Sequence, residues 1–182
     1  MDRKRARGHY LILGGARSGK SIFGERIALG LSSNPAYIAT AQTYDPEMVA
    51  RVKSHQQNRD TNFVTIEEPL ALSDAIKRAT VQHDVILVDC LTLWLSNIGF
   101  DEKTDKFRAM EDLLQTLQYV KKAQIILVSN EVGMGIVPDN ALAREFRDDA
   151  GLLHQKLAQI CDHVIMVAAG LPLAFKGEIP NF

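Results

Sequence analysis

The sequence has few cysteines and no surplus of charge of one sign. Cys90 and Cys161 lie in apolar stretches without the CxxC spacing of a metal or redox site, so we expect two buried free thiols. Lysine and arginine together number 21, aspartate and glutamate 22, and the formal net charge is only -1. Because such a balance creates no field that attracts nucleic acid, we predict no nucleic-acid partner.

Long apolar runs are also missing. No stretch is long enough for a signal peptide or a membrane-spanning helix, so we expect no membrane insertion and a cytoplasmic protein. The basic cluster Arg3–Arg7 could touch RNA or lipid, but a flexible, solvated N-terminus over residues 1–8 is the simpler interpretation. No repeat, low-complexity segment or linker divides the chain, and residues 1–182 are predicted to form a single domain.

Apolar runs rich in β-branched residues alternate with helix-like patterns along the chain. This alternation predicts an α/β fold with a mostly parallel central sheet and helices on both faces. The expected strands are Tyr10–Leu13, Ala36–Ala39, Phe63–Ile66, Val85–Asp89, Ile125–Ser129 and His163–Val167. The expected helices are Lys20–Leu31, Pro46–Gln57, Leu70–Ala79, Lys106–Lys121 and Asn140–Cys161. We expect a polar loop at 99–105 and an irregular tail after Gly170.

The strongest motif joins the first strand to the first helix. It reads Gly14-Gly15-Ala16-Arg17-Ser18-Gly19-Lys20-Ser21 and matches the pattern G-x-x-x-x-G-K-[ST] in its required context. Glycines let successive backbone N–H groups surround a phosphate, and the helix N-terminus adds partial positive charge. Lys20 can then reach the β- and γ-phosphates. The sequence predicts a P-loop NTPase-type domain that binds a nucleoside triphosphate, with Lys20 as a catalytic residue.

An acid at a strand end suggests a metal site. Asp89 closes the apolar run that begins at Val85, and beside a phosphate loop such an acid commonly holds Mg²⁺ together with the hydroxyl of the motif, here Ser21. The alternative is that Asp89 only ends the strand and caps the turn at residues 90–92. We expect Ser21 and Asp89 to be the metal ligands.

A helical pattern begins at Asp45-Pro46, an N-cap residue followed by proline at the first helical position. Glu47, Arg51 and His55 recur every four residues and therefore share one face. Spacing alone does not separate a functional histidine from an incidental one in a solvated charge ladder.

A second polar segment follows the fifth expected strand. Ser129-Asn130-Glu131 precedes a loop with Gly133 and Gly135, at the sheet edge where ligand loops gather. This segment is either a binding loop or an ordinary connection closed by an Asp139 or Asn140 cap. Further on, three charged residues either contact phosphate or pair with one another and with nearby acids. They are Arg144, Arg147 and Asp148.

Taken together, the motifs resemble the bifunctional adenosylcobinamide kinase / adenosylcobinamide-phosphate guanylyltransferase family of cobalamin biosynthesis. The resemblance covers nearly the whole chain, and its most specific part is the run from Asn130 to Pro138. The matching stretches are the phosphate loop, Tyr37-Ile38-Ala39-Thr40, Asp45-x-Glu47-Met48-x-x-Arg51-Val52-x-x-His55, Asn130-Glu131-Val132-Gly133-Met134-Gly135-Ile136-Val137-Pro138 and Ala143-Arg144-x-Phe146-Arg147-Asp148-x-x-Gly151.

The resemblance implies two reactions. A nucleoside triphosphate, ATP or GTP, phosphorylates the aminopropanol hydroxyl of adenosylcobinamide with Mg²⁺ present. GTP then transfers GMP to the new phosphate, giving adenosylcobinamide-GDP and pyrophosphate. The second reaction passes through a covalent guanylyl-histidine, and His55 occupies the matching position. The family is also similar in forming a homotrimer.

The resemblance further implies which residues surround the guanine nucleotide. Glu67 and its neighbour Glu68 are not distinguished by it. One departure from the family pattern is His154, where an asparagine is usual; its effect depends on whether that position touches substrate or only packs. The residues expected at the nucleotide, beyond the phosphate loop, are Ala39, Thr40, Ala41, Gln56, Gln57, Asn58, Arg59, Glu67 and Asp89.

Two other functions compete with this interpretation. A small-molecule kinase of another kind would use the phosphate loop but not His55. A regulatory GTPase would normally carry an Asn-Lys-x-Asp motif after a strand, and Asn130-Glu131-Val132-Gly133 is not one.

Overall fold

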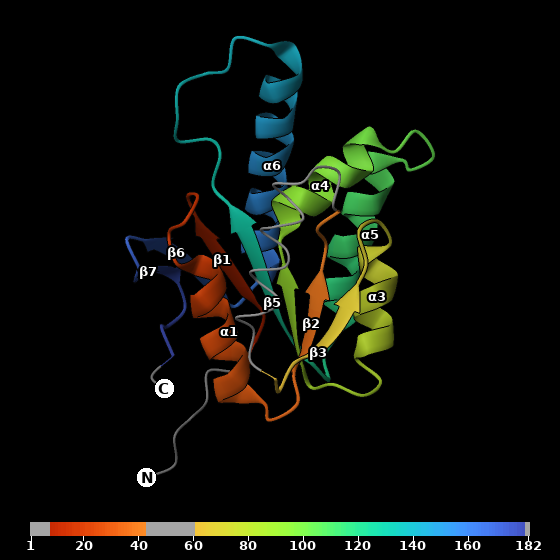
Figure 1. Ribbon diagram of the computed structural model, residues 1–182, viewed down its shortest axis with the longest axis vertical. Helices are drawn as coiled ribbons and strands as arrows, with labels where there is room; N and C mark the ends of the chain where they lie inside the picture. The colour runs from red at the N-terminus through yellow and green to blue at the C-terminus, as the bar shows by residue number, and fades with distance from the viewer. Residues whose placement is uncertain (1–7, 43–60, 181–182) are drawn as a thin grey trace.

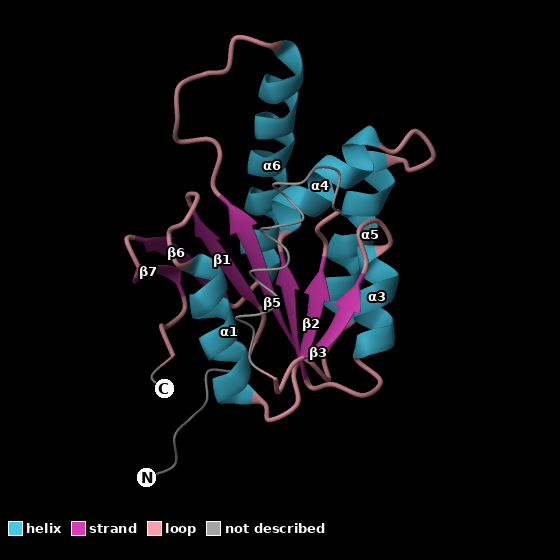
Figure 2. Ribbon diagram, viewed as in Figure 1, coloured by secondary structure: helices cyan, strands magenta, loops and turns pink. Residues whose placement is uncertain are grey.

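The computed structural model describes residues 8–42 and 61–180. Their core is a 7-stranded sheet of order β3-β2-β4-β5-β1-β6-β7, parallel except for β7, which runs antiparallel to β6 (Figures 1 and 2). The strands are β1 Tyr10–Gly14, β2 Ala36–Ala39, β3 Val64–Glu67, β4 Val85–Asp89, β5 Gln124–Asn130, β6 His163–Ala168 and β7 Leu171–Lys176.

Helices cover both faces of the sheet, as the alternating pattern predicted. Alternate residues of β1 point to opposite sides: Leu11 and Leu13 pack with α3, α4, α5 and α6, whereas Tyr10 and Ile12 pack with α1. Strands buried on both faces explain the continuous apolar runs in the sequence. The helices are α1 Lys20–Leu31, α3 Leu72–Ala79, α4 Leu91–Phe100, α5 Lys106–Tyr119 and α6 Ala141–Ile160.

The expected strands, and the expected helices that fall on described residues, are confirmed to within two residues at nearly every boundary. Helix Pro46–Gln57 lies outside the described residues. Helix α4 was missed, because it is apolar on nearly all sides and so has no polar face to produce a periodic pattern. Its Trp94 is buried, and the indole N–H donates to the Leu70 carbonyl at 2.9 Å.

The expectation of an irregular tail after Gly170 is wrong, because β7 forms there. Among residues 8–42 and 61–180, strand β7 pairs with β6 alone and lies at the edge of the sheet, where a proline such as Pro172 is tolerated. The turn before it uses Ala169 and Gly170 at φ 51° and 77°, in the left-handed region. Gly170 and Pro172 are typical of irregular segments, so the sequence did not indicate the short β6–β7 hairpin.

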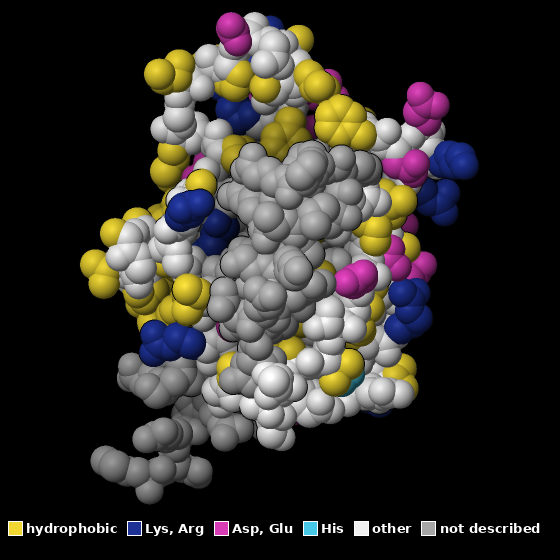
Figure 3. All heavy atoms as spheres, in the orientation of Figure 1, with side chains coloured by type: hydrophobic (Ala, Val, Ile, Leu, Met, Phe, Trp, Pro, Cys, Tyr) yellow, Lys and Arg dark blue, Asp and Glu magenta, His cyan; other side chains and the backbone are white. Residues whose placement is uncertain are grey.

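Among the exposed large hydrophobic side chains of the described residues, one group lies in the loop after β5 and another lies along β7 (Figure 3). Ile136 in that loop is 98% exposed. The others are Val132, Met134 and Val137 in the loop, and Leu171, Leu173 and Phe175 in β7. Among the described residues, no helix combines the length and the apolar character needed to cross a bilayer.

Candidate functional site

The phosphate loop connects the carboxyl end of β1 to the start of α1. Gly19 takes φ 95°, a conformation that favours glycine, and so lets the chain turn into the helix. The loop residues Gly15, Ala16 and Arg17 are exposed, while Lys20 is only 7% exposed. The Lys20 ammonium donates to the Gly15 carbonyl at 3.1 Å and is thus held across the loop.

The turn between β6 and β7 supports this loop from one side. Gly170 N–H donates to the Ser18 carbonyl at 2.8 Å. A Cβ on Gly14 would lie 2.4 Å from the Val167 carbonyl oxygen, so only glycine fits this close approach. Nothing in the local sequence signalled this support, because β7 itself was not predicted.

The loop has polar groups available for an anion. In the part of the chain that the structure describes, α1 has no side-chain cap at its N-terminus, so its first N–H groups can turn to a ligand. The buried Ser18 hydroxyl has no hydrogen-bond partner among the described residues. Together with Lys20, these groups form a cradle suited to phosphate.

Asp89 and Ser21 suit a magnesium ion whose other ligands are mainly phosphate oxygens and water. The Tyr37 hydroxyl donates to the Asp89 carboxylate at 2.8 Å and orients it, and both candidate ligands are partly exposed. No group of three or more His, Cys, Asp or Glu side chains suited to a metal occurs among residues 8–42 and 61–180. A hydroxyl and a carboxylate match Mg²⁺, which keeps several waters and phosphate oxygens as ligands.

Thr40 joins the ends of β2 and β4. Its hydroxyl donates to the Cys90 carbonyl at 2.8 Å and lies 2.9 Å from the Cys90 N–H, which donates to it. Asn97 of α4 donates to the Thr40 carbonyl at 2.7 Å. Thr40 is fully buried, whereas the adjacent Ala39 and Ala41 are partly exposed. The side chain that was expected at the nucleotide therefore holds the strand ends in register.

The structure separates Glu67 from Glu68. Glu68 accepts hydrogen bonds from the N–H groups of Leu70 and Ala71, at 3.2 and 2.9 Å, and so closes the turn that precedes α3. It also pairs with Arg78 at 3.4 Å. Glu67 is exposed at the end of β3, which lies at the same edge of the sheet as the phosphate loop.

The segment after β5 is held by contacts of its own. Asn140 caps α6 by accepting from the Ala143 N–H at 2.7 Å, which decides between the two cap candidates. Arg144 donates to the carbonyls of Pro138 and Asp139, and Arg147 pairs with Asp148 at 2.9 Å. The Arg147–Asp148 pair fits the second of the two interpretations, whereas Arg144 bonds backbone carbonyls, which neither interpretation foresaw.

The β5 strand lies between β4 and β1, so its carboxyl end stands between Asp89 and the phosphate loop. Asn130 pairs in register with Gly14, and the Glu131 N–H donates to the Gly14 carbonyl at 2.9 Å. Asn130 also donates to the Thr92 hydroxyl at 2.9 Å. The sequence left this segment as either a binding loop or an ordinary connection, and the strand order places its start beside the phosphate loop.

His154 is not a surface residue. It lies on α6 at 7% exposure, with Nε2 2.7 Å from the Ser129 hydroxyl and Nδ1 3.9 Å from a Glu131 carboxylate oxygen. Burial lowers the pKa of His154, and the negative charge of Glu131 partly opposes that shift. Burial therefore favours the neutral form of the imidazole.

The histidine expected to carry GMP lies outside the described residues, and so do its neighbours. These residues are Glu47, Arg51, His55, Gln56, Gln57, Asn58 and Arg59.

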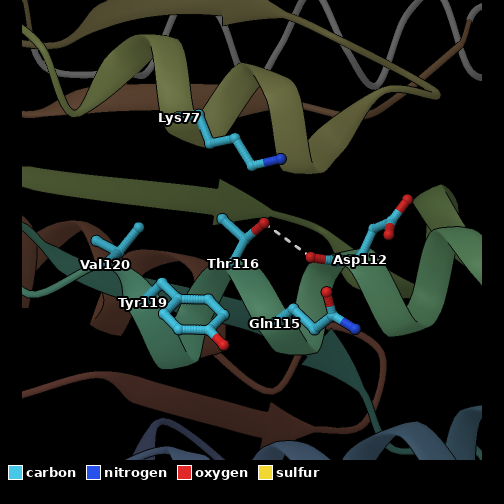
Figure 4. A pocket seen from close by; sticks show the side chains of 6 residues that line it. All are labelled: Lys77, Asp112, Gln115, Thr116, Tyr119 and Val120. Atoms are coloured by element: carbon cyan, nitrogen blue, oxygen red, sulfur yellow. Dashed lines mark hydrogen bonds between the residues drawn. The ribbon is translucent and has the colours of Figure 1, made fainter.

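A surface hollow of about 220 Å³ lies elsewhere, between α3 and α5 (Figure 4). Lys77 of α3 faces Asp112, Thr116 and Tyr119 of α5 across it. None of the predicted site residues that the structure describes lines this hollow.

The matches to known proteins agree with the family resemblance seen in the sequence. A family model described as "Cobinamide kinase / cobinamide phosphate guanyltransferase" matches residues 10–175. The chain is 44% identical over 168 residues to the "Bifunctional adenosylcobalamin biosynthesis protein CobP" of Pseudomonas aeruginosa, covering 92% of this chain and 97% of the relative. It is 40% identical over 179 residues to the "Bifunctional adenosylcobalamin biosynthesis protein CobU" of Escherichia coli, covering 91% and 98%.

Solved structures share the fold at low sequence identity. An ATPase from the type III secretion system of pathogenic bacteria matches with TM-score 0.54 and 14% identity, covering 92% of this chain and 57% of that one. A Pyrococcus horikoshii protein, titled as a structural study of Project ID PH0250, matches with TM-score 0.53 and 10% identity, covering 93% and 86%. These likenesses show a P-loop NTPase-type fold.

Proposed function

The chain belongs to the cobinamide kinase / cobinamide phosphate guanyltransferase family, and we propose that it carries out both reactions of that name. A nucleoside triphosphate phosphorylates the aminopropanol hydroxyl of adenosylcobinamide, and GTP then donates GMP to the resulting phosphate. The observation that carries the proposal is the phosphate loop: an intact G-x-x-x-x-G-K-[ST] motif between β1 and α1, with Lys20 held across it.

Positioning and charge stabilisation account for the kinase step. The loop N–H groups and Lys20 bind the β- and γ-phosphates and stabilise the negative charge that grows on the departing diphosphate. Ser21 and Asp89 would hold Mg²⁺, which when bound neutralises phosphate charge. The Tyr37 hydroxyl keeps the Asp89 carboxylate directed in one orientation.

We propose His55 as the GMP acceptor of the second reaction, on the strength of the resemblance. A neutral imidazole has a free ring nitrogen at physiological pH, because its unperturbed pKa is about 6.5. That nitrogen attacks the α-phosphorus, the bond from phosphorus to the pyrophosphate oxygen breaks, and pyrophosphate leaves with the electron pair. An oxygen of cobinamide phosphate then displaces the histidine and takes GMP.

The nucleotide is proposed to lie against the loop residues, Asp89 and the strand ends. Glu67 is the better candidate of the two glutamates because it is exposed at the carboxyl end of β3, whereas the Glu68 carboxylate accepts from the N–H groups of the turn before α3. Ala39 and Ala41 line the end of β2, and residues 56–59 complete the surroundings by the same resemblance.

A homotrimer in the cytoplasm remains our proposal for the assembly and its location. The exposed large apolar side chains after β5 and along β7 support contacts between copies, because exposed apolar surface often marks a protein–protein interface.

Labelled GTP tests the proposed function. Protein is incubated with GTP carrying label at the α- or the γ-phosphate, then denatured, and the bound label is counted. We expect retention of the α-label only, in an acid-labile form. The bound label should be lost in His55→Ala, a substitution that leaves the phosphate loop and α1 unchanged. If no α-label is bound under conditions in which cobinamide is phosphorylated, the protein is a kinase without the proposed guanylyltransferase mechanism.

A further inference from the structure

The two proposed reactions differ in one chemical need. The first nucleophile is a hydroxyl, which must lose its proton as it attacks phosphorus. The later nucleophiles are a neutral imidazole nitrogen and a phosphate oxygen that is already anionic, so neither needs a base. A general base in this site would therefore serve the kinase step alone.

Glu131 is a carboxylate at the required edge of the sheet. It is the first residue beyond β5, the strand between β1 and β4, and its N–H bonds directly to Gly14 at the start of the phosphate loop. Its side chain is 18% exposed, so it is accessible to a substrate but largely withdrawn from bulk water. The neighbouring Asn130 amide is already bonded to Thr92.

The surroundings of Glu131 hold its carboxylate in place. One oxygen accepts from the Gly133 N–H, and the other faces Nδ1 of His154 at 3.9 Å. This contact is longer than a hydrogen bond, but the charge of the carboxylate favours an N–H on the nearer ring nitrogen. We therefore assign the His154 proton to Nδ1, so that Nε2 accepts from the Ser129 hydroxyl at 2.7 Å. Ser129 is 1% exposed, so this bond fixes the ring from a buried anchor.

A neutral ring matters for the basicity of Glu131. Burial holds the pKa of His154 below its ordinary value, so the carboxylate faces an N–H dipole and not a full positive charge. A full cation at this distance would stabilise the ionised carboxylate and weaken it as a base. Each carboxylate oxygen still has a lone pair free for a proton.

We propose that Glu131 is the general base of the kinase step and that His154 is its positioning residue; this inference rests on the proposed function. The bond between the substrate hydroxyl oxygen and the γ-phosphorus forms, and the bond from that phosphorus to the β,γ-bridging oxygen breaks. The nucleoside diphosphate leaves with the electron pair. The hydroxyl proton passes to the Glu131 carboxylate and from there to water.

Separate assays of the two reactions test Glu131. Transfer of γ-label from the triphosphate to cobinamide measures the kinase step, and protein-bound α-label from GTP measures the guanylyl step. Glu131→Gln is expected to lower the kinase kcat by about 100-fold, the scale of general-base catalysis, and to leave guanylylation within about threefold. Glu145→Gln, the same change on an exposed α6 residue, is the matched control and keeps both activities.

His154 offers a matched pair of amide variants. His154→Asn keeps a donor near the Nδ1 position, toward Glu131, while His154→Gln keeps a polar group near Nε2, toward Ser129. If His154 positions Glu131, the Gln variant should lose about tenfold in kinase kcat with KM for nucleotide unchanged, and the Asn variant should stay within about threefold of the parent. A purely structural role through Ser129 reverses this order.

The outcomes distinguish the inference from the function beneath it. Failure of the unmodified protein to phosphorylate cobinamide overturns the proposed function and the base together. Normal kinase activity of Glu131→Gln, or equal loss of both reactions, overturns the base alone.

Discussion

His9 shows how a single residue ties separate elements together. It precedes β1, and its Nε2 lies 3.0 Å from the Leu117 carbonyl and 3.2 Å from the Val120 carbonyl at the end of α5. Its Nδ1 accepts from the Ile125 N–H at 3.1 Å at the start of β5. These contacts require the neutral tautomer with its proton on Nε2, because a protonated Nδ1 could not accept.

The buried state of His9 predicts a pH dependence of stability. Burial lowers the pKa of His9 from its ordinary 6.5, so the unfolded chain binds a proton more readily than the folded one. Its contribution to the free energy of unfolding is complete above pH 6.5 and is lost as pH falls from there to the folded pKa. Urea unfolding measured from pH 8 down to pH 5 should show this decline.

His9→Gln isolates the residue. At pH 8 it should destabilise the fold by about 1–3 kcal/mol, because the buried Ile125 N–H loses its acceptor. Below pH 6.5 its stability should fall less steeply than that of the parent, since one titrating group is gone. A slope as steep as the parent's would assign the acid sensitivity to other groups, among them His154, whose pKa burial also lowers.

Two glycines inside helices illustrate what packing does at the scale of elements. A Cβ on Gly24 of α1 would lie 3.1 Å from a Val128 methyl and 3.2 Å from a Leu87 methyl, so the helix sits directly against β4 and β5. A Cβ on Gly151 of α6 would meet no atom of the described residues within 4 Å. Glycine at position 24 thus lets α1 pack closely against the sheet, whereas at position 151 there is room for a Cβ among the described residues.

The two glycine-to-alanine variants should therefore differ in sign. Gly151→Ala should stabilise the protein by about 1 kcal/mol, the difference in helix propensity between the residues. Gly24→Ala gains the same propensity but pushes against the sheet, and we expect no net gain or a loss. Thermal unfolding checks both, where 1 kcal/mol corresponds to about 2–4 °C for a chain of this size. Equal stabilisation by both would mean that the α1–sheet contact yields freely.

At the scale of the whole molecule, the proposed nucleotide site is built from parts of the chain that are far apart in sequence. The loop after β1 is supported by the turn before β7, and Asp89 is oriented by Tyr37 of β2. A ligand that binds here favours the folded state only, so it should stabilise all of these elements at once.

Nucleotide should accordingly raise the melting temperature. At about 100 times its Kd, GTP with Mg²⁺ contributes about 2.7 kcal/mol to the free energy of unfolding. Lys20→Ala should lose most of this shift at the same ligand concentration, whereas Lys77→Ala on α3, with a side chain 57% exposed, should keep it. A full shift in Lys20→Ala would show that the loop is not where the nucleotide binds.

The amino-acid sequence by itself determined what depends on neighbouring residues. The phosphate loop is a contiguous motif, the buried strands are continuous apolar runs, and Asn140 lies next to the helix that it caps. Such features depend on local backbone geometry and on burial of one element at a time. The sequence therefore predicted the α/β class, the nucleotide and the resemblance on which the function rests.

Tertiary structure decided what depends on the order of strands and on contacts between distant residues. Only the order β4-β5-β1 brings Glu131 between Asp89 and the phosphate loop, and only α6 packing brings His154 to Ser129, 25 positions away in sequence. No local sequence pattern predicts these contacts, because the periodicity of apolar side chains indicates which face of an element is buried but not which other element covers it. For the same reason, helix α4, buried on nearly all sides, and the edge strand β7 emerged only in the folded chain.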